Sequence, residues 1–467
     1  MREKSTMNWS RATFFALGMT ALGRALQIAD GELGRNPYPA IMCLTIAILM
    51  SSLAIFTPRS SRIGQRGFTV VVTLCVMINF AQLVTKSPCV GVTSPDQLAP
   101  FAMGFAAAAL LCGVMLADQG IARVSAFAGL LLIVAILGGW AILNRPNPHI
   151  DVYVFQTDSS AALANGHDPY ELTFPNVFAP DTSLYAEGIV QDGRLQFGYP
   201  YLPETLFAVM PASLLHFDVR YAQLAAILGS AILIVAGNPS SLGFAAAILF
   251  LTTPRLFFVL EKSWTEPIVL LMLSATIACA IRWPRVLPIM LGLFLASKQY
   301  VPFAAILFFV GWRPMRQTIL LLIKAGIIAL IVTLPLVLWD ISAFWHSAIA
   351  LQFHQPFRYD ALSYLSWIGE SSFSKGAVVL IPFAALLSSV TLVLWRRRSI
   401  GFAASVAFCF LLFFAFNKQA FANYYFFVIG AMACAIAELA PNPNDPQLIA
   451  APDRKDFAPA HVAGATN

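Results

Sequence analysis

A polar stretch from His149 to Leu206 carries most of the side chains in this chain that could take part in chemistry. It contains eight carboxylates, from Asp151 to Glu204, together with two histidines and a single basic residue, Arg194. Long apolar segments lie on both sides of it. Because carboxylates often serve as general acids and bases, we look for a reaction centre first in this stretch.

Asp151 follows Pro146-Asn147-Pro148 and opens a segment of helix-forming composition that Gly166 can end. It is either the cap of that helix or a catalytic carboxylate, and the two roles are compatible. Asp158 lies seven residues further on, two turns along the same helix face. It either assists Asp151 or is a solvated surface acid.

Tyr199 and Tyr201 belong to a Tyr-Pro-Tyr-Leu-Pro run near the end of the polar stretch. The prolines exclude a regular helix, and tyrosines are typical of the membrane interface. The run is therefore either an interfacial anchor or the rigid edge of a pocket.

Lys298 lies in the middle of an apolar run, where a charge costs about 2.5–3.5 kcal/mol on insertion scales. It is either a functional residue with a partner or a side chain that snorkels to the interface. Glu266 lies in a short polar loop with Glu261 and Lys262, which suits mutual charge compensation.

Three further residues, His354, Arg358 and Lys418, lie in later loops, where they are either phosphate-binding groups or anchors. The eight-residue spacing of His346 and His354 is not a zinc motif. The sequence contains no P-loop, dinucleotide fingerprint, HExxH or GxSxG motif. Ser/His/Asp catalysis thus has no local support.

The composition places the protein in a membrane. Of 467 residues, 58% are hydrophobic and only 11% are charged, against about 25% charged in soluble domains. The net charge of +6 arises from short basic runs between apolar segments, as the positive-inside rule predicts, and does not indicate nucleic-acid binding. Most cysteines lie in apolar segments, so no disulfide framework is visible.

Hydropathy predicts an all-α polytopic protein with about 12–14 transmembrane helices. Spans are expected near 12–29, 38–57, 67–85, 98–117, 123–143, 221–237, 241–260, 265–282, 317–338, 376–395, 399–416 and 421–438. Basic residues at both ends of 286–312 predict a hairpin of two short helices with its tip at 297–300, and 203–216 is expected to lie on the outer face.

The arginine-rich loop after the second span should be cytoplasmic, so the loop 144–220 should lie outside. The same count places the other candidate residues on that outer side. The tail 441–467, rich in Pro, Asn, Asp and Ala, is expected to be cytoplasmic and disordered.

Three stretches of this chain, in their order and spacing, resemble the polyprenyl-phosphate-dependent membrane glycosyltransferases with the GT-C fold. They are DVYVFQTDSSAALANGHDPY, QFGYPYLPETLFAVMP and GLFLASKQYVP. It is most similar to their bacterial alpha-mannosyltransferase branch, glycosyltransferase family 87. The resemblance covers about residues 125 to 440. It implies a catalytic core at 123–440, with the first catalytic loop outside and additional helices at 1–122. The additional spans and the long loop after Tyr170 depart from the family pattern.

The resemblance implies that Asp151 is the general base of an inverting sugar transfer. It implies a substrate site formed by Asp158, Tyr199, Tyr201, Glu266, Lys298, His354, Arg358 and Lys418, of which the four basic residues would hold the phosphate. The donor would be a polyprenyl-phosphate sugar such as mannose, and the acceptor a glycan or lipid. No cofactor or metal is required, although Asp151 and Asp158 together could hold a metal ion. The expected location is a bacterial plasma (inner) membrane, with the active site facing the periplasm.

A transporter or flippase of a lipid-linked or small polar substrate is the main alternative, because it would also be polytopic with intramembrane charges. Transporters often contain inverted repeats, and none is visible here. A surface-polysaccharide ligase or polymerase should have its largest outer loop late in the chain, whereas here it is early. A purely structural role leaves the clustered acids unexplained.

Overall fold

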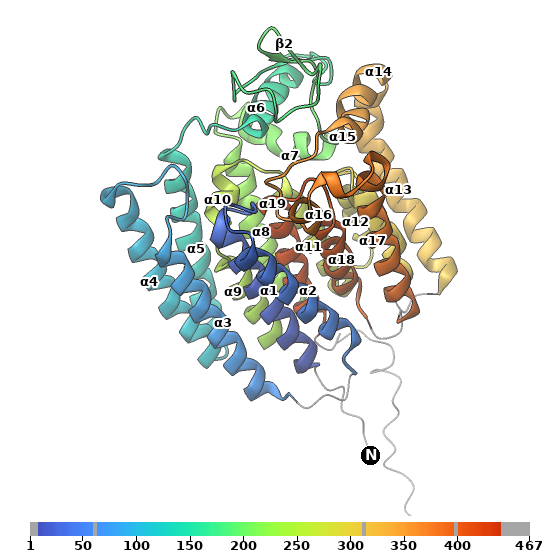
Figure 1. The fold of residues 1–467 in the computed structure, drawn as a ribbon. Coiled ribbons are helices and arrows are strands. Elements are labelled where there is room, and N and C mark those ends of the chain that lie inside the picture. The colour runs from blue at the N-terminus through green and yellow to red at the C-terminus, as the bar shows by residue number, and fades with distance from the viewer. Residues whose placement is uncertain (1–7, 59–62, 311–313, 397–399, 440–467) are drawn as a thin grey trace, which may run out of the picture.

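The computed structural model describes residues 8–58, 63–310, 314–396 and 400–439 and shows a mostly helical protein (Figure 1). The predicted tail at 441–467 lies outside these residues. Within them, eight helices are long and apolar enough to cross a membrane, as in a multi-pass membrane protein. They are α1 (Trp9–Ala29), α2 (Tyr38–Phe56), α3 (Gln65–Thr85), α4 (Pro95–Ala117), α5 (Ile121–Leu143), α8 (Arg220–Gly237), α13 (Met315–Val337) and α17 (Lys375–Trp395).

The other apolar segments form shorter or interrupted helices, which is why this number is below the expected 12–14. They are α9 (Ser241–Leu251), α10 (Leu256–Glu261), α11 (Glu266–Arg282), α12 (Leu287–Leu295), η1 (Val301–Val310), α18 (Phe402–Ala415) and α19 (Ala422–Glu438). Helices α18 and α19 are buried along nearly their whole length, so other helices rather than lipid surround them. The helices α12 and η1 form the expected hairpin, with residues 296–300 between them.

The N-terminal helix α1 belongs to the centre of the bundle. It packs against α2, α3, α9 and α19, although α19 is the last helix of the chain. Gln27 at its end donates a hydrogen bond of 2.7 Å to the carbonyl of Gln82 in α3. Helices α1 to α4 therefore share one apolar core with the later helices.

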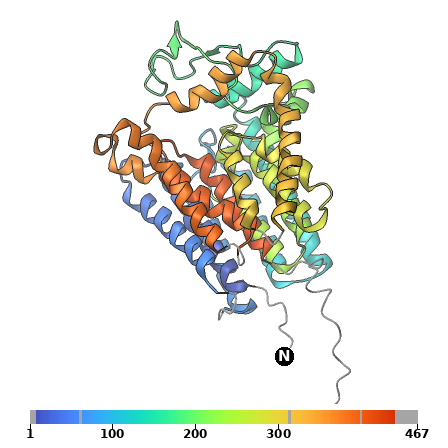
Figure 2. The ribbon, with the colours of Figure 1, turned by 90° about the vertical axis from the view of Figure 1, so that its right-hand side faces the viewer.

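A cap of non-spanning elements covers one end of the bundle (Figures 1 and 2). We define the cap as α6 (Asp151–Ala164), β1 (Phe174–Pro175), β2 (Val190–Gln191), β3 (Arg194–Leu195), α7 (Pro203–Leu214), α14 (Ile341–Phe344), η2 (Trp345–Ala350) and α15 (Leu351–His354). Its side chains form a second apolar core, built on Phe155, Phe174 and Phe197.

The cap contains a small antiparallel sheet in the order β1-β3-β2, so the fold is not purely α-helical. Asp192 and Gly193 connect β2 to β3 with φ angles of 49° and 73°. Two successive residues with positive φ favour the type I′ turn of a two-residue hairpin, for which Asp-Gly is a preferred pair. The Asp192-Gly193 dipeptide is thus a local sequence signal for this hairpin, which the all-α prediction did not include.

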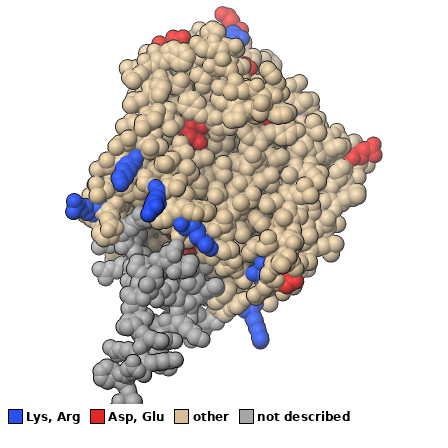
Figure 3. All heavy atoms as spheres, turned by 180° about the vertical axis from the view of Figure 1, so that it is seen from behind, with Lys and Arg blue, Asp and Glu red and all other residues tan. Residues whose placement is uncertain are grey.

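Basic residues concentrate at the end of the bundle away from the cap. Figure 3 shows most of the visible Lys and Arg side chains towards that lower end, whereas acidic side chains lie both at the cap and on the side and lower part of the molecule. The helix ends remote from the cap carry Arg66, Arg123, Arg282, Arg285, Arg316 and Arg396. The helix ends remote from the cap are thus rich in arginine.

Candidate functional site

Asp151 is the first residue of α6, and its carboxylate is held on both oxygens. The extended residue Ile150 precedes the helix and makes no capping bond, so Asp151 is not the N-cap in the strict sense. Its Oδ1 accepts the backbone N–H of Val152 at 2.7 Å, and its Oδ2 accepts the hydroxyl of Tyr185 at 3.0 Å. Burial raises the pKa of the Asp151 carboxyl, and the bonds from Tyr185 and Val152 and the charge of Arg358 oppose that rise.

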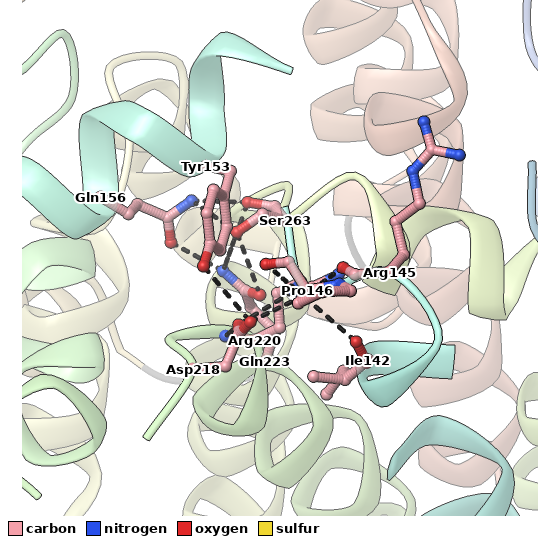
Figure 4. A network of polar contacts seen from close by, with 9 residues as sticks. All are labelled: Ile142, Arg145, Pro146, Tyr153, Gln156, Asp218, Arg220, Gln223 and Ser263. Carbon is pink, nitrogen blue, oxygen red and sulfur yellow. Dashed lines mark hydrogen bonds and ion pairs between the residues drawn. The ribbon is translucent and has the colours of Figure 1, made fainter. Parts of the chain in front are cut away.

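A buried arginine fixes the turn that leads into Asp151 (Figure 4). Arg220 forms an ion pair of 2.6 Å with Asp218 and donates to the carbonyls of Ile142, Arg145 and Pro146 at 3.4, 2.7 and 3.5 Å. These carbonyls belong to the end of α5 and the residues after it, where helical partners are missing. Arg220 therefore holds the exit of α5 against the start of α8.

A second set of buried bonds fixes α6 itself (Figure 4). Gln156 donates to the carbonyl of Ser263 at 2.5 Å, and Gln223 donates to the side-chain oxygen of Gln156 at 2.7 Å. These bonds tie α6 to α8 and to the loop before α11. Because Asp151 lies between the two networks in sequence, its backbone has little freedom to move.

Lys298, at the tip of the α12–η1 hairpin, is buried and ion-paired, so it does not snorkel to an interface. Its Nζ contacts the carboxylate of Glu266 and donates to the hydroxyl of Thr265 at 3.0 Å. The ammonium lies 4.8 Å from the centre of the Tyr201 ring and 5.4 Å from that of Tyr424. This aromatic and carboxylate environment compensates the charge of Lys298.

The Tyr-Pro-Tyr run lies between the cap and the hairpin, and its two tyrosines have different surroundings. Tyr199 is buried, and its hydroxyl lies 2.9 Å from that of Thr205, so its contacts are those of a core residue. Tyr201 is half-buried and faces Lys298. Burial raises the pKa of Tyr201, and the charges of Asp151 and Glu266 raise it further, which places this ring within the field of both carboxylates.

A glycine allows this run to approach the cap closely. A Cβ on Gly198 would lie 2.2 Å from the carbonyl oxygen of Tyr170, which is shorter than any real contact. The backbone N–H of Gly198 donates to the hydroxyl of Ser347 at 2.8 Å. Beyond it, Gln299 at the hairpin tip donates to the carbonyl of Pro200 at 2.9 Å. The run is therefore positioned from both sides.

Arg358 and Lys418 lie on two segments that pair through their backbones. The N–H of Arg358 donates to the carbonyl of Lys418 at 3.2 Å, and the Arg358 guanidinium pairs with Asp360 at 2.6 Å. Lys418 donates to the carbonyls of Phe353, at 3.4 Å, and Gln355. Among the described residues, no ion pair includes Lys418, so its charge lacks a carboxylate partner there.

The loop between α1 and α2 reaches this same region. Glu32 forms an isolated antiparallel bridge with Ala361, and the N–H of Leu33 donates to the carbonyl of Asp360 at 2.9 Å. The charge of Arg358 acts on Glu32 as well as on Asp151. The N-terminal helices thus contribute a border of the candidate site, and no local motif in the sequence indicated it.

Two of the predicted site residues lie apart from the others. Asp158 is exposed; partial burial of its carboxyl raises its pKa, and the charge of Arg194 on β3 opposes that rise. No hydrogen bond or ion pair joins Asp158 to Asp151 in the described part of the chain. His354 is exposed and its Nδ1 lies 2.8 Å from the carbonyl oxygen of Ala350 in the same helical run. No group of three or more His, Cys, Asp or Glu side chains with metal-site geometry occurs among the described residues.

The chain matches no protein-family model, no curated protein and no solved structure in the corresponding comparisons.

Proposed function

We propose that this protein is a GT-C-type membrane glycosyltransferase that moves a sugar, mannose in the closest family branch, from a polyprenyl phosphate to a glycan or lipid acceptor. The observation that carries the proposal is the arrangement around Asp151. A half-buried carboxylate, hydrogen-bonded on both oxygens, shares one end of a membrane bundle with Tyr201, Arg358 and the Lys298–Glu266 pair. These groups come from distant parts of the sequence.

Asp151 suits the role of general base. Its pKa is raised by burial, and a carboxylate with a raised pKa binds a proton more strongly than an ordinary one. It would take the proton of an acceptor hydroxyl as the hydroxyl oxygen attacks the anomeric carbon of the donor. The bond from that carbon to the phosphate oxygen breaks as the new bond forms on the opposite face, so the anomeric configuration inverts.

The leaving polyprenyl phosphate needs positive charge rather than an acid, because it is already an anion of low basicity. Lys418 is the best candidate for this contact, since within the described ranges its hydrogen bonds go to backbone carbonyls and it forms no ion pair. Arg358 contributes from the adjacent segment, and His354 lies close in sequence. Lys298 is already compensated by Glu266, so it suits orientation of the substrate more than charge neutralisation.

This mechanism requires no metal or cofactor. We propose in addition that the reaction takes place on the outer face of a bacterial inner membrane, with the cap in the periplasm and the basic helix ends in the cytoplasm, as the positive-inside rule favours. The partners are the lipid-linked donor, the acceptor and the surrounding lipids.

Ser183→Cys is expected to react with a membrane-impermeant maleimide from outside intact spheroplasts. Ser183 is exposed in the cap, whereas all seven native cysteines are buried and should give little background. The matched control is Thr69→Cys, in the first turns of α3 and remote from the cap. This cysteine should react only after permeabilisation. The reverse labelling pattern would place the cap in the cytoplasm and contradict the proposed orientation.

The proposed activity is tested by offering a panel of polyprenyl-phosphate sugars to the protein in proteoliposomes, with varied glycan and lipid acceptors. We expect consumption of one donor and formation of an inverted linkage. If the folded protein consumes no donor, the transporter alternative gains support from the buried Lys298–Glu266 pair, because paired charges inside a bundle also occur on substrate pathways. Flux of the same lipids across the bilayer is then the assay.

A further inference from the structure

Tyr185 contacts the carboxylate that we propose as the base. It lies in the irregular segment 176–189 of the cap, between β1 and β2. Its hydroxyl donates to Asp151 Oδ2 at 3.0 Å, and the side chain is 8% exposed. The ring packs against Phe178, with ring centres 6.5 Å apart, and Phe178 packs against His149, with centres 5.3 Å apart. Tyr185 is therefore held from the same segment that precedes Asp151.

The surroundings of Asp151 leave Tyr185 as its one side-chain hydrogen-bond donor among the described residues. The Val152 N–H on Oδ1 belongs to the backbone of α6. Arg358, from the segment after α15, acts through its charge. Tyr201, before α7, lies in the field of the carboxylate and contributes no hydrogen bond to it. The position of Oδ2 thus depends on Tyr185.

We propose that Tyr185 is a positioning residue for Asp151, whose hydroxyl fixes the orientation of Oδ2 through their hydrogen bond. This inference rests on the proposed function, in which Asp151 is the base. The bonds from Val152 to Oδ1 and from Tyr185 to Oδ2 together fix the plane of the carboxylate. An acceptor hydroxyl would therefore approach a carboxylate that is already oriented. Tyr185 itself exchanges no proton with substrate.

The direction in which Tyr185 moves the pKa of Asp151 depends on whether its hydrogen bond favours the ionised or the protonated carboxyl. Tyr185 donates to the ionised carboxylate, so its hydroxyl lowers the pKa of Asp151 against the rise caused by burial. Removal of the hydroxyl leaves that rise less opposed, and the folded-state pKa of Asp151 increases. A smaller fraction of the protein then carries the ionised base at acidic pH, while at high pH the fraction returns to that of the wild type.

Tyr185→Phe should therefore shift the acidic limb of kcat/KM to higher pH by about one unit, which is about a tenfold loss of rate below both pKa values. The ring and its contact with Phe178 remain. The control is Tyr359→Phe, which removes a 2.9 Å hydrogen bond from an exposed tyrosine to Glu370 and should leave the profile unchanged. An unshifted profile in Tyr185→Phe would overturn the inference.

A second measurement does not depend on turnover. The infrared carbonyl band that disappears in Asp151→Asn is titrated with pH in the wild type and in Tyr185→Phe, and its midpoint should rise in the variant. An equal midpoint in the two proteins contradicts the role of Tyr185, whatever the activity. Full activity of Asp151→Asn, by contrast, refutes the proposed base, so the two failures are distinguishable.

Discussion

Asp151→Asn should abolish sugar transfer, with a loss of about 10²- to 10⁴-fold in kcat and an unchanged fold. The amide has almost the size of the carboxylate, and its oxygen can still accept from Val152 or Tyr185. It cannot accept a proton from the attacking hydroxyl, because a neutral amide is a very weak base. The rate is measured in proteoliposomes with the donor that the wild type consumes, and folding by thermal unfolding in detergent.

Asp158→Asn is the matched control, because it makes the same chemical change on the same helix. Asp158 is exposed and remote from the Tyr185 bond, so this variant should retain a rate close to that of the wild type. Near-normal turnover of Asp151→Asn would instead assign Asp151 to the stability of the helix start. Loss of activity in both variants would point to a general need for negative charge on α6.

Lys298→Met is expected to destabilise the protein by about 3–5 kcal/mol, because it leaves the Glu266 carboxylate buried without its counter-ion. Glu266 is fully buried, and one of its oxygens, Oε2, already lacks a hydrogen-bond partner among the residues that the structure describes. The loss is measured as a lower unfolding temperature in detergent and a smaller folded fraction. A variant as stable as the wild type would show that the pair contributes little.

The double variant Glu266→Gln with Lys298→Met separates stability from substrate binding. Removing both charges leaves neither member of this pair as a lone buried charge, so most of the lost stability should return. Donor dependence is then measured on this folded protein. A raised KM for the lipid donor supports a binding role for the Lys298 region, whereas an unchanged KM restricts the pair to holding the hairpin tip against α11.

Local sequence patterns predicted much of the fold. Apolar runs of spanning length correspond to α1–α5, α8, α13 and α17. The two short helices around Lys298 followed from basic residues at both ends of 286–312. The interruption between α9 and α10 was not predicted. There Pro254 lacks an N–H and excludes a continuous helix, and Arg255 adopts a φ of +68° while pairing with Asp30 at 2.5 Å.

The sequence identified Asp151 and Lys298 as candidate site residues from their types and positions, but it predicted their contacts only in part. Asp151 and Lys298 stood out because a carboxylate at a loop start and a cation in an apolar run are costly or rare. Their partners did not stand out, because they are distant in sequence. Tyr185 is 34 residues from Asp151, and Glu266 is 32 residues from Lys298. Tyr199 carried the same local pattern as Tyr201, yet one is buried in the cap core and the other faces Lys298.

Composition and the order of apolar and polar residues along the chain predict that lipid surrounds this protein, where its helices approximately lie, and that acidic residues are concentrated in one loop. These properties depend on composition and on neighbours along the chain, because burial in lipid and helix formation are governed by local hydropathy. Only the folded structure shows that Lys298 pairs with Glu266, that Tyr185 contacts Asp151, that Arg220 binds the turn before Asp151, and that the loop after α1 pairs with the segment that follows Arg358. The reason is that desolvation and hydrogen bonding act between side chains that meet in space, and no period or spacing along the chain encodes which of them will meet.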